Sequence, residues 1–180
     1  MKNTPVLNRK IVFNGYNKIE KLSIKTKKSK IIERELLKNK DGVCAIIYDT
    51  KKDKYLVVEQ WRPSLNGMMK ELIAGSIEIN ETPLESVEKE VLEETGYECD
   101  YIQYINSFYV SPGTISEKVY LYYVEVSNQI SNIIGCQEED EELDLIELSY
   151  DELCDTLFID AKSIIGVNWL KSFQKKLSII

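Results

Sequence analysis

Histidine is absent from this chain of 180 residues. Its absence excludes a Ser-His or Cys-His nucleophile and any zinc site with imidazole ligands, because those sites need that side chain. The groups that remain for acid–base chemistry are carboxylates, Lys, Tyr and Ser, together with metal-bound water. Any reaction must therefore run on these groups.

Cysteine is scarce, and no C-x-x-C pair occurs among the four residues Cys44, Cys99, Cys136 and Cys154. This spacing matches no common zinc or dithiol motif and indicates reduced thiols. Cys44 and Cys99 lie in strand-like apolar contexts. We expect both to pack in or near the core.

Long apolar runs are also missing, since none approaches the length of about 18 residues that indicates a membrane helix. The opening residues Met1-Lys2-Asn3-Thr4 do not begin a signal-peptide pattern, so we expect a cytoplasmic protein. The net charge of −7 argues against a nucleic acid or an anionic membrane as a partner. A hydrophobic content of 43% is ordinary for a globular protein with one well-formed core.

The clearest local signal is a helix with both ends marked. Thr82 is a good N-cap, Pro83 suits the first helical position, and Glu85 completes a capping box. Gly96 supplies the stop. The spacing predicts that three apolar residues share the side facing the core: Leu84, Val87 and Val91.

Three carboxylates, Glu90, Glu93 and Glu94, converge on one arc of this helix because they stand at i, i+3 and i+4. Taken alone, they read as a solvated acidic face. Alternatively, they are a cluster of hard oxygen ligands that suits Mg²⁺ or Mn²⁺.

The wider segment Gly75–Tyr97, GSIEINETPLESVEKEVLEETGY, favours the second interpretation. It resembles the Nudix box, G-x5-E-x7-R-E-U-x-E-E-x-G-U, in which U is a bulky apolar residue. Lys89 replaces the family's Arg, which keeps the charge but loses the planar fork. The resemblance implies that Glu81 and Lys89 orient the ligating carboxylates from outside the metal shell.

The fold implied by this resemblance is an α+β Nudix fold, an α/β/α sandwich with a mixed sheet, at residues 39–180. The strands expected in it are 42–48, 55–61, 101–109, 117–126 and 143–148, and two later helices are predicted to begin after the capping residues Ser149 and Asp160. Residues 1–38 read as an N-terminal antiparallel β extension with a turn at Asn14-Gly15. In the nucleotide-sugar branch of the family such a sheet pairs with a second subunit, so we expect a homodimer.

Two segments before the box resemble the ADP-ribose pyrophosphatase-like branch. The first, EQWRP at 59–63, implies that Arg62 binds phosphate and Trp61 stacks on a base or ribose. Without the resemblance, Trp61 reads as a core residue at a strand end. The second, ELIAGSIE at 71–78, implies that the Ala74 carbonyl is a metal ligand and that Glu71 lies near the metal-bound phosphates.

Two segments after the box carry further candidates. Pro112, within SPG, resembles the mark of members that hydrolyse ADP-ribose, although it is equally a simple Pro-Gly turn. Glu117 is either a ribose contact or a surface residue. The acidic run 138–142 resembles the family's catalytic loop, with Glu139 as the candidate base and Glu141 beside the metals; by itself it reads as a solvated loop.

The resemblance implies a Mg²⁺-dependent hydrolase, with Mn²⁺ as a possible substitute, that cleaves the pyrophosphate bond of a nucleoside diphosphate sugar. ADP-ribose, giving AMP and ribose 5-phosphate, is the first substrate to consider; GDP-mannose or another nucleotide sugar is the alternative. Glu90, Glu94, the Ala74 carbonyl and Glu93 would hold the metals, and Glu139 or Glu93 would accept the proton. A non-catalytic nucleotide-binding module is the rival from another class.

Overall fold

The computed structural model describes residues 6–131 and 143–177 and divides the chain into two compact units. The first unit comprises residues 1–41 together with Tyr109–Lys118, and the second comprises Gly42–Phe108 together with Val119–Ile180. The sequence division at residue 38 stays a prediction. No helix within the described ranges is long and apolar enough to cross a bilayer.

The first unit is an antiparallel sheet of β1 (Val6–Asn14), β2 (Lys18–Lys25) and β3 (Ile31–Lys38), in that order. The predicted turn at Asn14-Gly15 connects the first two strands. The end of β3 is fixed to the second piece of the unit, because Leu37 N donates to Thr114 O at 2.8 Å and Ser116 N donates to Leu37 O at 3.0 Å. Sequence reasoning did not connect these two segments.

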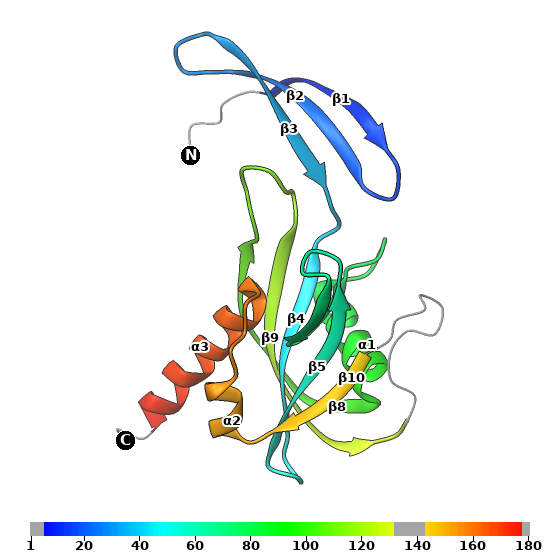
Figure 1. Cartoon of the computed structure of the whole chain (residues 1–180), viewed down its shortest axis with the longest axis vertical. Helices are drawn as coiled ribbons and strands as arrows, with labels where there is room; N and C mark the ends of the chain where they lie inside the picture. The colour runs from blue at the N-terminus through cyan, green and yellow to red at the C-terminus, as the bar shows by residue number, and fades with distance from the viewer. Residues whose placement is uncertain (1–5, 132–142, 178–180) are drawn as a thin grey trace. The chain divides into compact units, whose positions relative to one another are not determined.

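The second unit is built on a seven-stranded mixed sheet, as the predicted fold requires (Figure 1). Its central order is β10-β5-β4-β9-β8; β4 and β9 are parallel, and β5 is antiparallel to both of its neighbours. The strands are β4 (Gly42–Asp49), β5 (Lys54–Arg62), β6 (Gly67–Glu71), β7 (Ile73–Ser76), β8 (Tyr97–Tyr109), β9 (Lys118–Gln129) and β10 (Leu143–Leu148).

The two central strands β4 and β5 separate soon after their turn. They pair only from Ile47 to Asp49 with Lys54 to Leu56. Beyond that point β7 pairs with β4, from Ala45↔Ile73 to Gly42↔Ser76, and β6 pairs with the far end of β5. The chain from β6 to β7 therefore crosses between the diverging strands, which brings Glu71 and Ala74 to the centre of the sheet.

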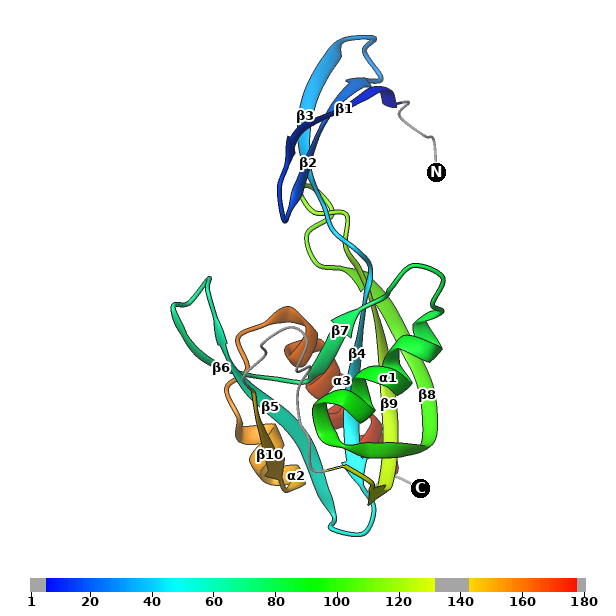
Figure 2. The same cartoon turned by 90° about the vertical axis from the view of Figure 1, so that its right-hand side faces the viewer.

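Helices cover both faces of this sheet, which gives the three layers of the predicted sandwich (Figures 1 and 2). Alternation along β4 explains the layering: Val43 and Ile47 pack with α1 (Pro83–Thr95), whereas Cys44 and Ile46 pack with α2 (Tyr150–Asp155) and α3 (Ala161–Leu177). Both core clusters are closed to solvent, so β4, whose sequence GVCAIIY is a continuous apolar run, is buried on its two sides.

Helix α1 begins and ends as its sequence signals indicate. Thr82 and Glu85 form the reciprocal capping box, and Gly96 is the C-cap in the left-handed region with φ of 74°. Val87 and Val91 are fully buried. The expectation for Leu84 is wrong: its side chain is 48% exposed, because it lies in the first turn of the helix, beyond the packed side.

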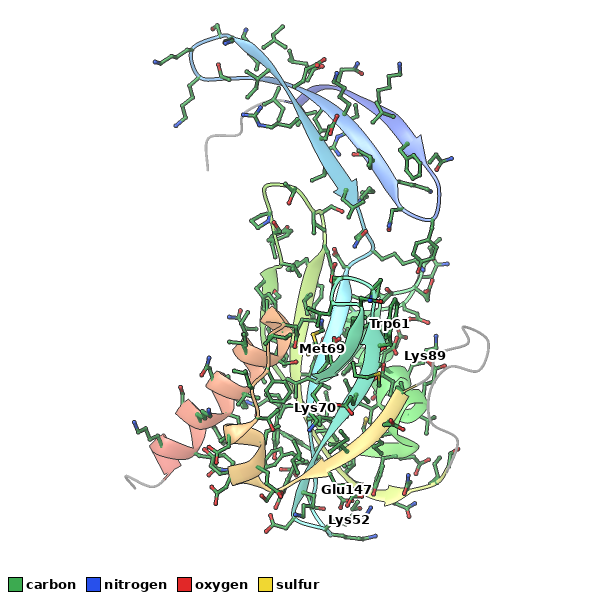
Figure 3. The ribbon with its side chains drawn as sticks, in the orientation of Figure 1. Lys52, Trp61, Met69, Lys70, Lys89 and Glu147 are labelled. Carbon is green, nitrogen blue, oxygen red and sulfur yellow. The ribbon has the colours of Figure 1, made fainter. Side chains whose placement is uncertain are left out.

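Residues after α1 anchor the helix to the turn between β4 and β5. The Tyr97 hydroxyl donates to Asp49 Oδ2 at 2.8 Å, and the Lys52 ammonium lies 5.6 Å from the Tyr97 ring centroid. Lys52 also forms an ion pair with Glu147 of β10, the two residues labelled together in Figure 3. Burial is the main cause that raises the pKa of the Tyr97 phenol, so it stays a neutral donor near pH 7.

The geometry at Gly96 generates a stability prediction. Gly96→Ala forces a side chain into a left-handed backbone, and the added Cβ would collide with the carbonyl oxygen of Ser131. We expect the free energy of unfolding to fall by about 2 kcal/mol in urea titrations. Gly113→Ala is the matched control, because a Cβ there meets nothing within 4 Å. Equal stabilities of the two variants would contradict this account of the helix end.

Candidate active site

The carboxylates of α1 lie in different environments. Glu94 is buried at 4% exposure, whereas the Glu93 side chain is 35% exposed and its Oε1 lies 3.9 Å from Lys89 Nζ. The nearby Glu93 carboxylate is the main cause that raises the pKa of Lys89. Lys89 therefore stays charged beside the acidic arc, although through a single ammonium and not a fork.

Glu90 is pressed against the backbone of β7. Its carboxylate occupies the space where a side chain on Gly75 would begin, so any residue but glycine would displace it. Gly75 directly follows Ala74, and β7 is held against β4 through the Cys44↔Ala74 pair. The fold thus brings the Glu90 carboxylate next to the backbone that carries the Ala74 carbonyl.

The oxygen atoms of Glu90, Glu94 and Ala74 are of the type that binds a hard divalent cation. Glu90 and Glu94 stand one helical turn apart, and Ala74 offers a carbonyl oxygen from the adjoining strand; carboxylate and carbonyl oxygens are the ligands that Mg²⁺ and Mn²⁺ prefer. Across residues 6–131 and 143–177, no three acidic or thiol side chains form a group that could hold a metal. Glu139 and Glu141 lie outside the described residues.

Glu81 joins the loop before α1 to the helix itself. Its Oε2 accepts a hydrogen bond from Ser86 Oγ at 2.8 Å and another from Glu78 N at 3.3 Å. Ser86 is buried at 1% exposure, so its hydroxyl needs an acceptor inside the protein. Glu81 thereby fixes the approach to the helix that carries Glu90 and Glu94, a contact that suits the orienting role expected of it.

Arg62 and Glu71 meet in a two-point ion pair. Arg62 Nε donates to Glu71 Oε1 at 2.5 Å, and Arg62 Nη2 donates to Glu71 Oε2 at 3.1 Å. The Glu71 side chain is 1% exposed and the Arg62 side chain 33% exposed. The two residues face the same side of the β5–β6 ladder, four positions apart along it, because Glu71 pairs with Val58 and Arg62 with Gly67.

A second cation reaches Glu71 from α3, and sequence reasoning missed it. Lys162 Nζ lies 3.3 Å from Glu71 Oε2 and 3.4 Å from Asp160 Oδ1. Burial of this ammonium lowers its pKa, but the carboxylates of Glu71 and Asp160 more than offset burial, so the net pKa is raised. The sequence held one relevant signal, the helix cap at Asp160, which gave no indication of Glu71.

Trp61 lies at the rim of the β5–β6 hairpin, and its interpretation as a core residue is wrong because it is 52% exposed. Its cross-strand partner is Met68, which is 53% exposed, and neither residue belongs to a core cluster. Figure 3 labels Trp61 together with Met69 and Lys70 of the facing strand. An exposed indole on a short hairpin is available for stacking.

Glu117 belongs to the first unit, where it accepts a hydrogen bond from Asn39 Nδ2 at 3.3 Å. Glu117 is thus not part of the site described in the second unit, which combines α1, β5, β6, β7 and α3. This site comprises Arg62, Glu71, Ala74, Glu90, Glu94 and Lys162.

Comparison with known proteins identifies the family to which this arrangement corresponds. The family model described as the NUDIX domain matches residues 38–165. Among solved structures, an ADP compounds hydrolase superimposes with a TM-score of 0.82 over 100% of this chain and 98% of that one. The sequence identity in that superposition is 14%, so the likeness supports the fold.

Two curated relatives are more similar in sequence. The methanol dehydrogenase activator of Bacillus methanolicus is 36% identical over 143 residues, which cover 77% of this chain and 76% of the relative. The GDP-mannose pyrophosphatase of Escherichia coli strain K12 is 27% identical over 150 residues, which cover 78% of each chain.

Proposed function

The chain belongs to the NUDIX domain family of hydrolases, and from this premise we propose that it hydrolyses the pyrophosphate bond of a nucleoside diphosphate sugar, with ADP-ribose as the first substrate. The observation that carries the proposal is the placement of Glu90 against the Ala74–Gly75 backbone, one helical turn from the buried Glu94. This arrangement offers oxygen ligands, and Arg62, which pairs with Glu71 three residues before Ala74, offers a guanidinium that can bind phosphate.

Nudix hydrolases generally use divalent metal ions, and we propose Mg²⁺, with Mn²⁺ as a substitute, for this chain. Glu90, Glu94 and the Ala74 carbonyl would hold the ions, with Glu93 and Glu141 as further candidates. When bound, such an ion neutralises charge on the diphosphate and lowers the pKa of a water molecule.

The remaining side chains have separate parts in this proposal. Arg62 binds the diphosphate oxygens, and Trp61 stacks on the base or ribose. The ribose contact expected of Glu117, which lies in the first unit, stays a prediction from the sequence. Glu93 or Glu139 accepts the proton from the attacking water. The products from ADP-ribose are AMP and ribose 5-phosphate.

A second candidate substrate is GDP-mannose, which the E. coli relative's name supports. A role in activating a dehydrogenase is a further candidate, because the B. methanolicus relative is named for it and is 36% identical. A cytoplasmic location stays a prediction from the sequence.

Substrate class is tested by phosphate release, coupled to a phosphatase, from ADP-ribose, GDP-mannose, ADP-glucose, diadenosine polyphosphates and dNTPs. We expect strong turnover of a nucleotide sugar that is lost with EDTA and restored by Mg²⁺ or Mn²⁺, because the diphosphate needs its charge neutralised. A folded protein that is silent on the whole panel with either ion would favour the binding-only module.

Glu94→Gln tests the metal ligands. The amide keeps the shape of the buried side chain but lowers its affinity for a cation, so we expect kcat to fall by roughly three orders of magnitude in the coupled assay. Glu88→Gln is the matched control, since Glu88 is an exposed glutamate of the same helix. Near-normal turnover by Glu94→Gln with an unchanged urea midpoint would refute the ligand assignment.

We propose also that two copies of the chain associate through the N-terminal sheet. Support comes from β1, every residue of which is exposed, including five large apolar side chains: Val6, Leu7, Ile11, Val12 and Phe13. Charge complementarity favours a contact between the sheet of one copy and the acidic remainder of the other, because residues 1–41 hold 12 Lys and Arg against 4 Asp and Glu, whereas the remaining residues hold 11 against 26.

Sedimentation equilibrium at micromolar concentration tests the association. We expect a particle of twice the chain mass of 20.8 kDa. Ile11→Lys should reduce it to the mass of one chain, because a charge would be placed in the apolar contact. Lys10→Gln is the neighbouring control and should leave the dimer intact. A wild-type protein of single-chain mass would overturn the proposal.

A further inference from the structure

We infer that Lys162 is a positioning residue for substrate binding: it is the second cation of Glu71, and it allows Arg62 to leave Glu71 for the diphosphate. The inference rests on the proposed function in one respect, namely that Arg62 binds the phosphate oxygens of a nucleotide. Lys162 acts through Glu71 and is not assigned a contact with substrate.

Arg62 is already engaged by Glu71. Its Nε and Nη2 each donate to one oxygen of Glu71, which is the same two-point geometry that a guanidinium uses to bind phosphate. The fork that faces Glu71 cannot serve both anions at once. Binding of a diphosphate by that fork therefore requires Arg62 to exchange one anion for the other.

When Arg62 moves to the diphosphate, it leaves the negative charge of Glu71 behind. The Glu71 side chain is 1% exposed, so water cannot solvate it after Arg62 departs. A buried carboxylate stripped of its only counter-ion is strongly unfavourable, and that cost would be subtracted from substrate affinity. Lys162, at 3.3 Å from Glu71 Oε2, keeps the carboxylate compensated throughout the exchange.

The packing of α3 holds Lys162 in position beside Glu71. The next residue, Ser163, is fully buried, and its Oγ accepts a hydrogen bond from Leu72 N at 2.9 Å. One turn later, a Cβ on Gly166 would lie 2.6 Å from Leu72 Cδ1, so α3 approaches this segment closely. The start of α3 is therefore fixed to the residue that directly follows Glu71.

Asp160 completes the arrangement. Its Oδ1 accepts a hydrogen bond from Ser163 N at 3.0 Å, which caps α3, and also lies 3.4 Å from Lys162 Nζ. The carboxylates of Glu71 and Asp160 and the two cations that face them thus form one half-buried cluster without net charge. Because Lys162 stays bound to Asp160 and Glu71 alike, it remains in place when Arg62 moves.

The experiment measures ADP binding by calorimetry in the presence of Mg²⁺, in the native background and in a Glu71→Gln background. In the native background we expect Lys162→Met to raise Kd for ADP about tenfold. In the Glu71→Gln background the same substitution should change Kd by less than about twofold, because a neutral amide needs no counter-ion. Lys162→Arg, which keeps the charge, should bind as the native protein does.

Three controls make this comparison specific. Lys171→Met removes a positive charge from the same helix at a residue that contacts Cys154 O, and it should leave Kd unchanged. Urea unfolding of each variant checks that α3 remains docked. On a substrate that turns over, Lys162→Met should raise KM and leave kcat within about twofold, since the chemistry is untouched.

The outcomes separate this inference from the proposed function. The same weakening by Lys162→Met in both backgrounds would make Lys162 a direct anion contact and overturn the inference. ADP binding that Lys162→Met does not alter would also overturn it. So would the absence of ADP binding by the native protein. If ADP binds with the expected dependence on Glu71 but no nucleotide sugar is hydrolysed, the inference stands and the proposed reaction fails.

Discussion

The early separation of β4 from β5 is the constraint on which the site depends. The two strands share pairs only from Ile47 to Asp49, and the backbone groups beyond that point need other partners because they are buried. β6 and β7 supply those partners, and the chain must therefore cross from one strand to the other at Glu71–Ile73. That crossing places a buried carboxylate and a metal-ligand candidate between α1 and α3. A regular β4–β5 ladder would leave no room for either.

Signals that act within a few residues were readable from the sequence. The start and end of α1 depend on Thr82, Glu85 and Gly96 and on backbone groups within one turn of them, so capping rules located both ends. The caps at Ser149 and Asp160 were found for the same reason. The continuous apolar run at 42–48 is likewise typical of a strand buried on both faces, and the Nudix resemblance identified the layers that cover them.

Features that arise from packing between distant segments were not readable in this way. Lys162 meets Glu71 across 91 positions of sequence, and no local pattern distinguishes it from other lysines at a helix start. Leu84 follows the apolar period of α1 but falls outside the contact area, because periodicity gives a direction and not the extent of the neighbouring layer. Trp61 was ambiguous for a related reason: whether a strand end is covered depends on where its hairpin partner stops.

The charges of the site fall into two groups that are compensated differently. Glu71 is neutralised inside the protein by Arg62 and Lys162, which are supplied by two separate elements. Glu90 and Glu94 stand one turn apart on α1, a spacing at which like charges repel, and Lys89 of the same helix is directed to Glu93. The first group therefore offers a guanidinium that can bind an anion, and the second offers carboxylates that can bind cations. A diphosphate bound with divalent ions is the ligand class that satisfies both groups together, which is why its binding should depend on Lys162 and on the metal at once.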